Sequence, residues 1–131
     1  MQIAAAYLTA AATFLVMDLV WLGVVARNFY RAELGPLMAD TINWPAGLAF
    51  YALFIAGLVV FVIHPALAAG SVKQAFVMGA LFGLVAYATY DLTNLAVMRG
   101  FPWRMALVDM TWGAVATSVS AAVAVAVAGR M

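Results

Sequence analysis

The chain has 131 residues, of which 69% are hydrophobic and only 8% are charged. Soluble domains are about 45–50% apolar and about 25% charged, so this composition excludes a water-soluble fold and is typical of a polytopic helical membrane protein. A net charge of +1 without a basic patch gives no reason to expect nucleic-acid binding. The absence of cysteine excludes disulfides, thiolate metal sites and cysteine nucleophiles.

Four hydrophobic runs each reach the length of about 20 residues that a helix needs to cross a bilayer. We therefore expect an all-α fold with a single domain, a bundle of four transmembrane helices over residues 3–25, 44–63, 75–98 and 105–128. Uninterrupted apolar runs argue against transmembrane β-strands, which alternate. The first run lacks a basic leader and carries Asp18, so we expect a retained span rather than a cleaved signal peptide.

Glycine and proline, which terminate helices, indicate where the first two helices end. Gly35-Pro36 is the first strong stop signal after the first span, which predicts that the first helix continues beyond the membrane to Leu34. His64-Pro65 is expected to end the second helix, and Gly70-Ser71 to form the turn before the third.

The third and fourth runs contain the small residues that allow helices to approach closely. Gly79 and Gly83 are four residues apart and so share one helix face, which favours a packing surface. The fourth run is almost wholly alanine, valine, serine, threonine and glycine after Trp112. We expect these two helices to pack tightly.

Lysine and arginine counts set the expected orientation. The first and third loops carry Arg27, Arg31, Arg99 and Arg104, whereas the opposite side carries Lys73 and Arg130. Positively charged loops are retained in the cytoplasm, so both termini are expected outside.

Three aspartates interrupt the apolar spans at a similar depth. Asp18 and Asp91 each lie seven residues before the expected end of their spans, and Asp109 lies five residues after Arg104. At about 1.5 Å per residue, all three lie roughly 7–11 Å inside the same boundary. Carboxylates that face lipid are costly. We expect the three acids to face one interior pocket on the side of Arg27 and Arg99.

Other polar side chains accompany the acids. Each acid is followed three residues later, on the same helix face, by a group that can hydrogen bond to it: Trp21 after Asp18, Asn94 after Asp91, and Trp112 after Asp109. Tyr87 and Tyr90 add hydroxyl groups. Crowded carboxylates in a low dielectric cannot all be ionised, so at least one is expected to hold a proton. An arginine side chain that reaches inward from a loop would neutralise a second aspartate and allow the pocket to accept anions or headgroups.

The plain alternative is that the acids only bridge helices, as polar groups do in membrane bundles. Three acids at one level favour a functional pocket over that alternative. Hard oxygen ligands suit Mg²⁺ or Ca²⁺, but no Asp-x-x-Asp pair occurs, so we expect neither a metal nor another cofactor. The only histidine lies on the opposite side from the aspartates, so Ser-His-Asp catalysis has no support.

Several motifs together resemble a known family. They are Asp18-x-x-Trp21-Leu22-Gly23, Gly79-Ala80-Leu81-Phe82-Gly83, Tyr87-Ala88-Thr89-Tyr90-Asp91-Leu92-Thr93-Asn94 and Asp109-x-x-Trp112-Gly113. The chain resembles, over nearly its whole length, a family of small four-span bacterial predicted membrane proteins of unknown function. The resemblance implies a bacterial inner membrane location and no particular activity.

Three functions remain open at this point. The first is binding or transport of a small polar molecule or lipid headgroup, coupled to a proton and carried out by a homodimer, with Asp91 as the central acid and Asn94 as its orienting partner. The second is an enzyme that modifies a lipid or isoprenoid by aspartate acid–base chemistry. The third is a structural or accessory subunit.

Overall fold

The computed structural model describes residues 1–131 and confirms an all-α membrane bundle. Four helical segments are long and apolar enough to cross a membrane. The first is α1 (Gln2–Val20) with a π-helical turn η1 (Trp21–Val25); the second is α3 (Trp44–Leu58), η3 (Val59–Ile63) and α4 (His64–Ala69); the third is α5 (Val72–Val97); and the fourth is α6 (Trp103–Ala128). Between the first two lie the short helix α2 (Arg27–Leu34) and a 3₁₀ turn η2 (Gly35–Leu37).

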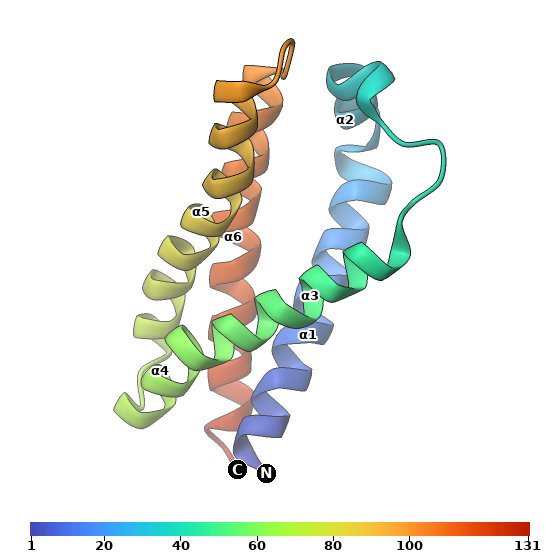
Figure 1. Cartoon of the computed structure of the whole chain (residues 1–131). Helices are drawn as coiled ribbons and strands as arrows, with labels where there is room; N and C mark the ends of the chain where they lie inside the picture. The colour runs from blue at the N-terminus through green and yellow to red at the C-terminus, as the bar shows by residue number, and fades with distance from the viewer.

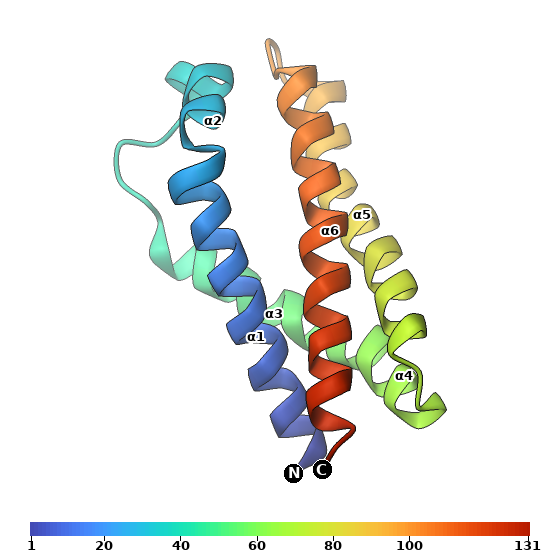
Figure 2. The same ribbon diagram turned by 180° about the vertical axis from the view of Figure 1, so that it is seen from behind.

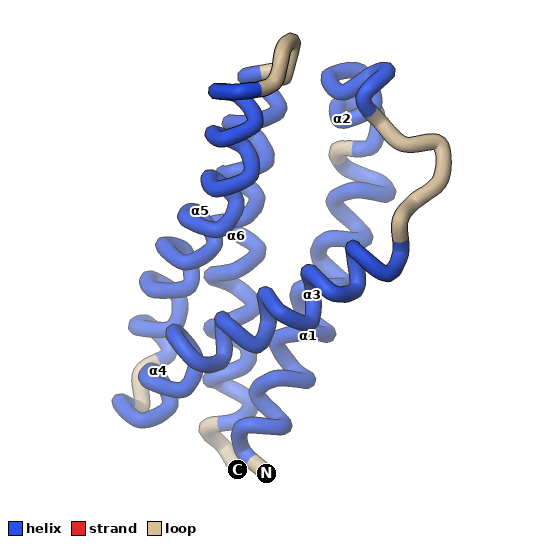
Figure 3. The backbone as a smooth tube through the Cα atoms, viewed as in Figure 1, coloured by secondary structure: helices blue, strands red, loops and turns tan.

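The helices diverge toward one end of the molecule. Helices α5 and α6 form an antiparallel hairpin, and α1 lies beside α6 at the end that carries both termini (Figures 1 and 2). Toward the other end, α1 and α2 separate from the hairpin, while α3 crosses the bundle obliquely. The longest stretch without helix joins α2 to α3 (Figure 3). The bundle is therefore closed at the termini and splayed at the end where α2 lies.

Small residues let α5 and α6 approach closely, as the sequence predicts. A Cβ atom added at Gly83 would overlap the carbonyl oxygen of Gly113 and the side chain of Thr117. One added at Gly79 would lie 3.0 Å from the Cβ of Ala121. Backbone contact of this kind supplies the dispersion energy that holds membrane helices together, because burial from lipid supplies none.

The apolar core fills the closed end. Phe14, Leu58 and Ile63 are fully buried there, together with a run of alanines on α1 and α6. Many other large apolar side chains are exposed, which is the pattern of a surface that faces lipid. This packing fixes α1 and α6 beside each other just below the polar layer.

The first helix does not continue unbroken to Leu34, so that expectation is wrong. The amide of Ala26 bonds to the carbonyl of Trp21 in a π-type turn, and Ala26 then leaves helical geometry with φ −110° and ψ 8°. Helix resumes as α2, which ends at Leu34 as Gly35-Pro36 predicts, and Gly35 caps it with a φ of 48° that suits glycine. No glycine or proline marks Ala26, so the sequence contained no signal for this break.

The second helix continues through His64-Pro65 to Ala69, which corrects the predicted end at Ile63. A proline inside an α-helix lacks an amide donor and clashes with the carbonyl four residues earlier. The π-helical turn Val59–Ile63 directly before it widens the helix, and Pro65 then occupies the first turn of α4. Gly70, at φ 63°, ends the segment, and Ser71 caps α5 by accepting a hydrogen bond from the Gln74 amide at 3.0 Å.

Candidate functional site

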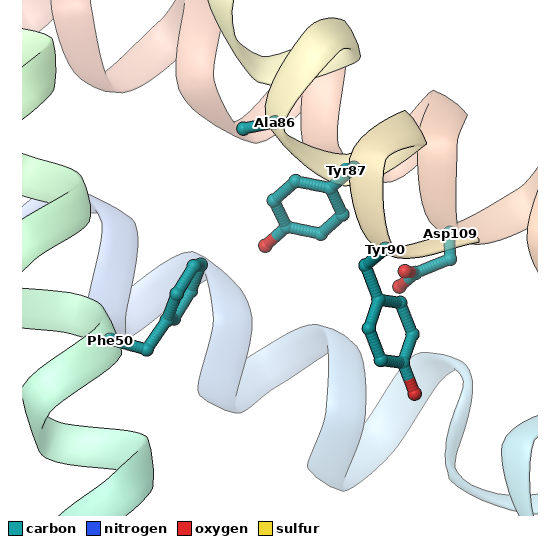
Figure 4. A pocket seen from close by; sticks show the side chains of 5 residues that line it. All are labelled: Phe50, Ala86, Tyr87, Tyr90 and Asp109. Atoms are coloured by element: carbon teal, nitrogen blue, oxygen red, sulfur yellow. The ribbon is translucent and has the colours of Figure 1, made fainter. Parts of the chain in front are cut away.

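The polar layer lines two adjoining cavities at the splayed end of the bundle. The larger, about 370 Å³, is lined by Phe50, Ala86, Tyr87, Tyr90 and Asp109 (Figure 4). The smaller, about 250 Å³, shares the last three of these and adds Asp18, Leu22, Tyr30, Leu34 and Met105. In Figure 4 the Tyr87 ring projects from α5 toward Phe50 of α3, and the Asp109 carboxylate extends from α6 toward Tyr90. All four spans thus contribute residues to these two cavities.

Asp18 is buried and fully engaged in hydrogen bonds. Its side chain is 6% exposed. One carboxylate oxygen accepts a hydrogen bond from the Tyr51 hydroxyl of α3, and the other accepts one from the Trp112 indole N–H of α6 at 3.1 Å. Asp18 therefore ties α1 to two other helices.

Asp109 is held by a relay that begins on the first span. The Tyr30 hydroxyl donates to Asp109 at 2.8 Å and accepts from the Trp21 indole N–H at 3.1 Å. Burial raises the pKa of the Tyr30 hydroxyl well above its ordinary value, the Asp109 carboxylate adds to that rise, and the bond from Trp21 opposes it. Tyr30 therefore remains a proton donor to Asp109 even in alkaline solution.

Each tryptophan bonds, directly or through Tyr30, to the aspartate of the opposite helix, so the predicted pairing within each helix is wrong. Because α1 and α6 are antiparallel, Trp112 reaches the level of Asp18, and Trp21 reaches the level of Asp109 through Tyr30. The two indoles stack between these levels, with ring centroids 4.5 Å apart and planes 5° from parallel. Sequence spacing places the residues on one face but does not say which neighbour each will contact.

Asp91 differs from the other two acids because it lacks a hydrogen-bond donor. Its side chain is completely buried, and neither carboxylate oxygen receives a hydrogen bond. Asn94, the partner predicted for Asp91, therefore does not bond to it. The Asp91 carboxyl instead lies close to that of Asp109. Two ionised carboxylates are both acceptors, so they can bond to each other only when one proton lies between them.

No arginine enters this layer, contrary to the expectation that one would neutralise an acid. Arg27, Arg31, Arg99 and Arg104 are all exposed, and Arg104 lies over the Trp103 ring at 5.7 Å. The hydrogen bonds to Asp18 and Asp109 come from tyrosine and tryptophan. The protein thus places three acids in the cavity region and no basic side chain beside them.

Two tyrosines of the site were missed as site residues by the sequence reasoning. Tyr51 is seven residues inside the start of its span at Trp44, the same depth as the aspartates, and this shared depth is the sequence signal that identifies it. Tyr30 lies outside the spans, and only the break at Ala26 brings it back to Asp109. No sequence signal indicates that contact.

The acids are not arranged as an enclosed cation cage. No group of three or more histidine, cysteine, aspartate or glutamate side chains lies close enough together to hold a metal ion. Asp18 is held apart from the Asp91–Asp109 pair by its own bonds to Tyr51 and Trp112.

Four apolar helices of membrane-spanning length, with a polar layer between them, define a multi-pass integral membrane protein. The chain belongs to the family described as "Predicted membrane protein (DUF2177)", whose model matches residues 3–126. No curated protein matches the chain, and no solved structure matches it.

Proposed function

We propose that this protein binds a small polar molecule or a lipid headgroup in the two adjoining cavities between α1, α2, α3 and the α5–α6 hairpin, and that binding is coupled to a proton on the Asp91–Asp109 pair. The observation that carries the proposal is the Asp91 carboxyl, which is fully buried without a donor. Leaving a buried acceptor unpaired costs about 1–3 kcal/mol, and more when it is charged. A protein retains a destabilising buried group of this kind where the group serves function rather than stability.

A purely structural role accounts for Asp18 better than for Asp91. Asp18 bridges three helices through two hydrogen bonds, as polar groups do in membrane bundles. Asp91 receives no hydrogen bond from a tyrosine, tryptophan or backbone group, and α5 is already held to α6 by the close approach at Gly83. An alanine or leucine at position 91 would serve helix packing equally well.

The cavity lies toward the end that carries Arg27 and Arg99, which we propose to be the cytoplasmic side of a bacterial inner membrane. The opposite end is filled by the apolar core. A single copy therefore offers a site that is accessible from one side. Transport would require a second arrangement of the helices, which we propose a homodimer supplies, as in transporters built from paired repeats. Exposed Arg27, Arg31, Arg99 and Arg104 would contact lipid phosphates at that boundary.

The proposal can be tested in liposomes that contain a pH-sensitive dye. A panel of small polar solutes and soluble headgroup analogues is presented to the wild type, to Asp91→Asn, and to Asp40→Asn as a matched control, because Asp40 is exposed in the loop before α3. We expect at least one compound to change proton uptake or release in the wild type and the control, but not in Asp91→Asn. An Asp91→Asn protein that responds as the wild type does would refute the proposal.

A second candidate function is an enzyme that acts on a lipid or isoprenoid. Two carboxyl groups that share one proton can act as acid and base, and a groove of about 450 Å³ lies beside the stacked indoles, lined by Trp21, Leu107, Val108, Thr111, Trp112 and Val115. Its mostly apolar lining suits an acyl or isoprenoid chain. An altered lipid profile on deletion, restored by the wild type and not by Asp91→Asn, would favour this function over binding alone.

A further inference from the structure

The charge balance of the cavity restricts what it can bind. Asp18 and Asp109 line it, and Asp91 lies close to Asp109. The chain has only six lysine and arginine residues, and all six are exposed, as is its single histidine. A phosphate, sulfate or carboxylate entering the cavity would meet acids without any basic side chain. A cation would meet compensating charge.

The lining of the cavity is aromatic as well as acidic. Phe50, Tyr87 and Tyr90 contribute most of the wall of the larger cavity, and Asp109 provides its acidic member (Figure 4). The negative faces of aromatic rings attract cations, by about 2 kcal/mol where water is excluded. Rings beside a carboxylate therefore suit an organic cation that has an apolar part.

The carboxylate of Asp109 indicates which kind of organic cation fits. Asp109 lines both cavities, and one of its oxygens accepts a hydrogen bond from Tyr30. A ligand that bonds to this carboxylate must bring N–H or O–H groups. A quaternary ammonium ion has none, whereas a primary or secondary ammonium ion has two or three. A bare metal ion is a poorer fit, because no three acidic side chains converge on one point.

We propose that the ligand is an organic ammonium ion whose N–H groups bond to Asp109, and that its arrival releases a proton that Asp109 otherwise shares with Asp91. The apolar part of the ligand packs on Tyr87, Tyr90 and Phe50. This inference rests on the proposed function and names the ligand class of the same site. One positive charge enters and one proton leaves to water for each ligand bound, so the net charge of the cavity is unchanged. The ammonium group can belong to a free amine or to the headgroup of an aminolipid.

Other titratable groups around the pair limit what the pH dependence can come from. The ones that the packed elements place nearest are Asp18 on α1, Tyr30 on α2, Tyr51 on α3, and Tyr87 and Tyr90 on α5. The tyrosines are ordinarily neutral below about pH 9, and both oxygens of Asp18 already accept hydrogen bonds from Tyr51 and Trp112. A proton released at neutral pH is therefore assigned to the Asp91–Asp109 pair.

The test uses three probes that share a phenyl ring and differ in their head: benzylammonium, benzyl alcohol and benzoate. Purified full-length protein in phosphatidylglycerol nanodiscs is titrated with each, and binding is followed by fluorescence, since Trp21 and Trp112 lie in the polar layer. We expect benzylammonium to bind at least about tenfold more tightly than benzyl alcohol, a difference of about 1.4 kcal/mol, and benzoate not to bind. Between about pH 6 and 8, where an alkyl amine stays protonated, its affinity should rise with pH, because binding releases a proton.

Variants and lipids complete the experiment. Asp109→Asn should lose at least about tenfold in benzylammonium affinity and lose the pH dependence, Asp91→Asn provides a second variant should Asp109→Asn not fold, and Asp40→Asn should match the wild type. Adding phosphatidylethanolamine, which carries N–H groups, should weaken benzylammonium binding if the natural ligand is an aminolipid, whereas phosphatidylcholine should not. Competition by free ethanolamine alone would identify a soluble amine.

Different failures have different meanings. Benzyl alcohol or benzoate binding as tightly as benzylammonium, in a way that Asp109→Asn abolishes, would overturn the ammonium assignment and leave the proposed binding function standing. Benzylammonium affinity that is independent of pH would overturn the proton exchange. No saturable binding by any probe, or binding unchanged in both aspartate variants, would overturn both proposals.

Discussion

Replacing aspartate by asparagine should have opposite consequences at positions 18 and 91. At Asp18 both carboxylate oxygens accept hydrogen bonds, from the Tyr51 hydroxyl and the Trp112 indole. Asparagine can accept from the Trp112 indole with its one oxygen, and its NH₂ group must then donate to the Tyr51 hydroxyl instead of accepting from it. Exchanging two hydrogen bonds to a carboxylate for two weaker bonds to a neutral amide should lower the free energy of unfolding by about 1–2 kcal/mol.

At Asp91 the same substitution supplies what the site lacks. The carboxyl has no donor and faces that of Asp109. An asparagine N–H at this position can donate to the Asp109 carboxylate without a shared proton. We expect the free energy of unfolding of Asp91→Asn to be between unchanged and about 2 kcal/mol higher than that of the wild type.

Thermal unfolding in a mild detergent, followed by far-ultraviolet circular dichroism, measures both variants against the wild type and the exposed control Asp40→Asn. For a chain of this size, 1 kcal/mol corresponds to a shift of roughly 3–5 °C in the midpoint. The reasoning fails if Asp91→Asn is destabilised as much as Asp18→Asn, because Asp91 would then be a structural bridge. It also fails if Asp18→Asn is unaffected.

Three further predictions concern packing, titration and topology. Gly83→Ala should lower the unfolding midpoint by the equivalent of about 1–3 kcal/mol, because its Cβ overlaps α6, whereas Gly47→Ala, with open space around it, should lose nothing in the same assay. Because the pKa of Tyr30 is raised, above about pH 10 the folded chain holds a proton that the unfolded chain releases. The free energy of unfolding should therefore fall with rising pH in this range, and it should fall less in Tyr30→Phe. Equal pH profiles for the two proteins would contradict the relay to Asp109. Because the chain has no native cysteine, Lys73→Cys should react with a membrane-impermeant maleimide in intact cells and Arg99→Cys only after permeabilisation; the reverse pattern would invert the proposed orientation.

The class of fold follows from composition alone. When four runs of about 20 apolar residues enter a bilayer, each must satisfy its own backbone hydrogen bonds, and a helix is the way a single segment does so. The cost of carboxylates in lipid then requires Asp18 and Asp109 to face inward, and the structure places both on one cavity. The spacing of Gly79 and Gly83 likewise identified the face on which α5 meets α6. These conclusions depend on the lipid environment of each apolar run and on helical spacing, and both can be read from neighbouring residues in the sequence.

The partner of each acid was decided by tertiary structure. Whether Trp112 bonds to Asp109 on its own helix or to Asp18 on another depends on the antiparallel placement of α1 and α6, and Tyr30 reaches Asp109 only because the chain breaks at Ala26. The missing donor at Asp91 is likewise a property of the assembled bundle. Hydrogen bonds between side chains far apart in the sequence require distances of about 3 Å. Helical periodicity defines which face a residue occupies, and only the packed helices determine what lies opposite that face.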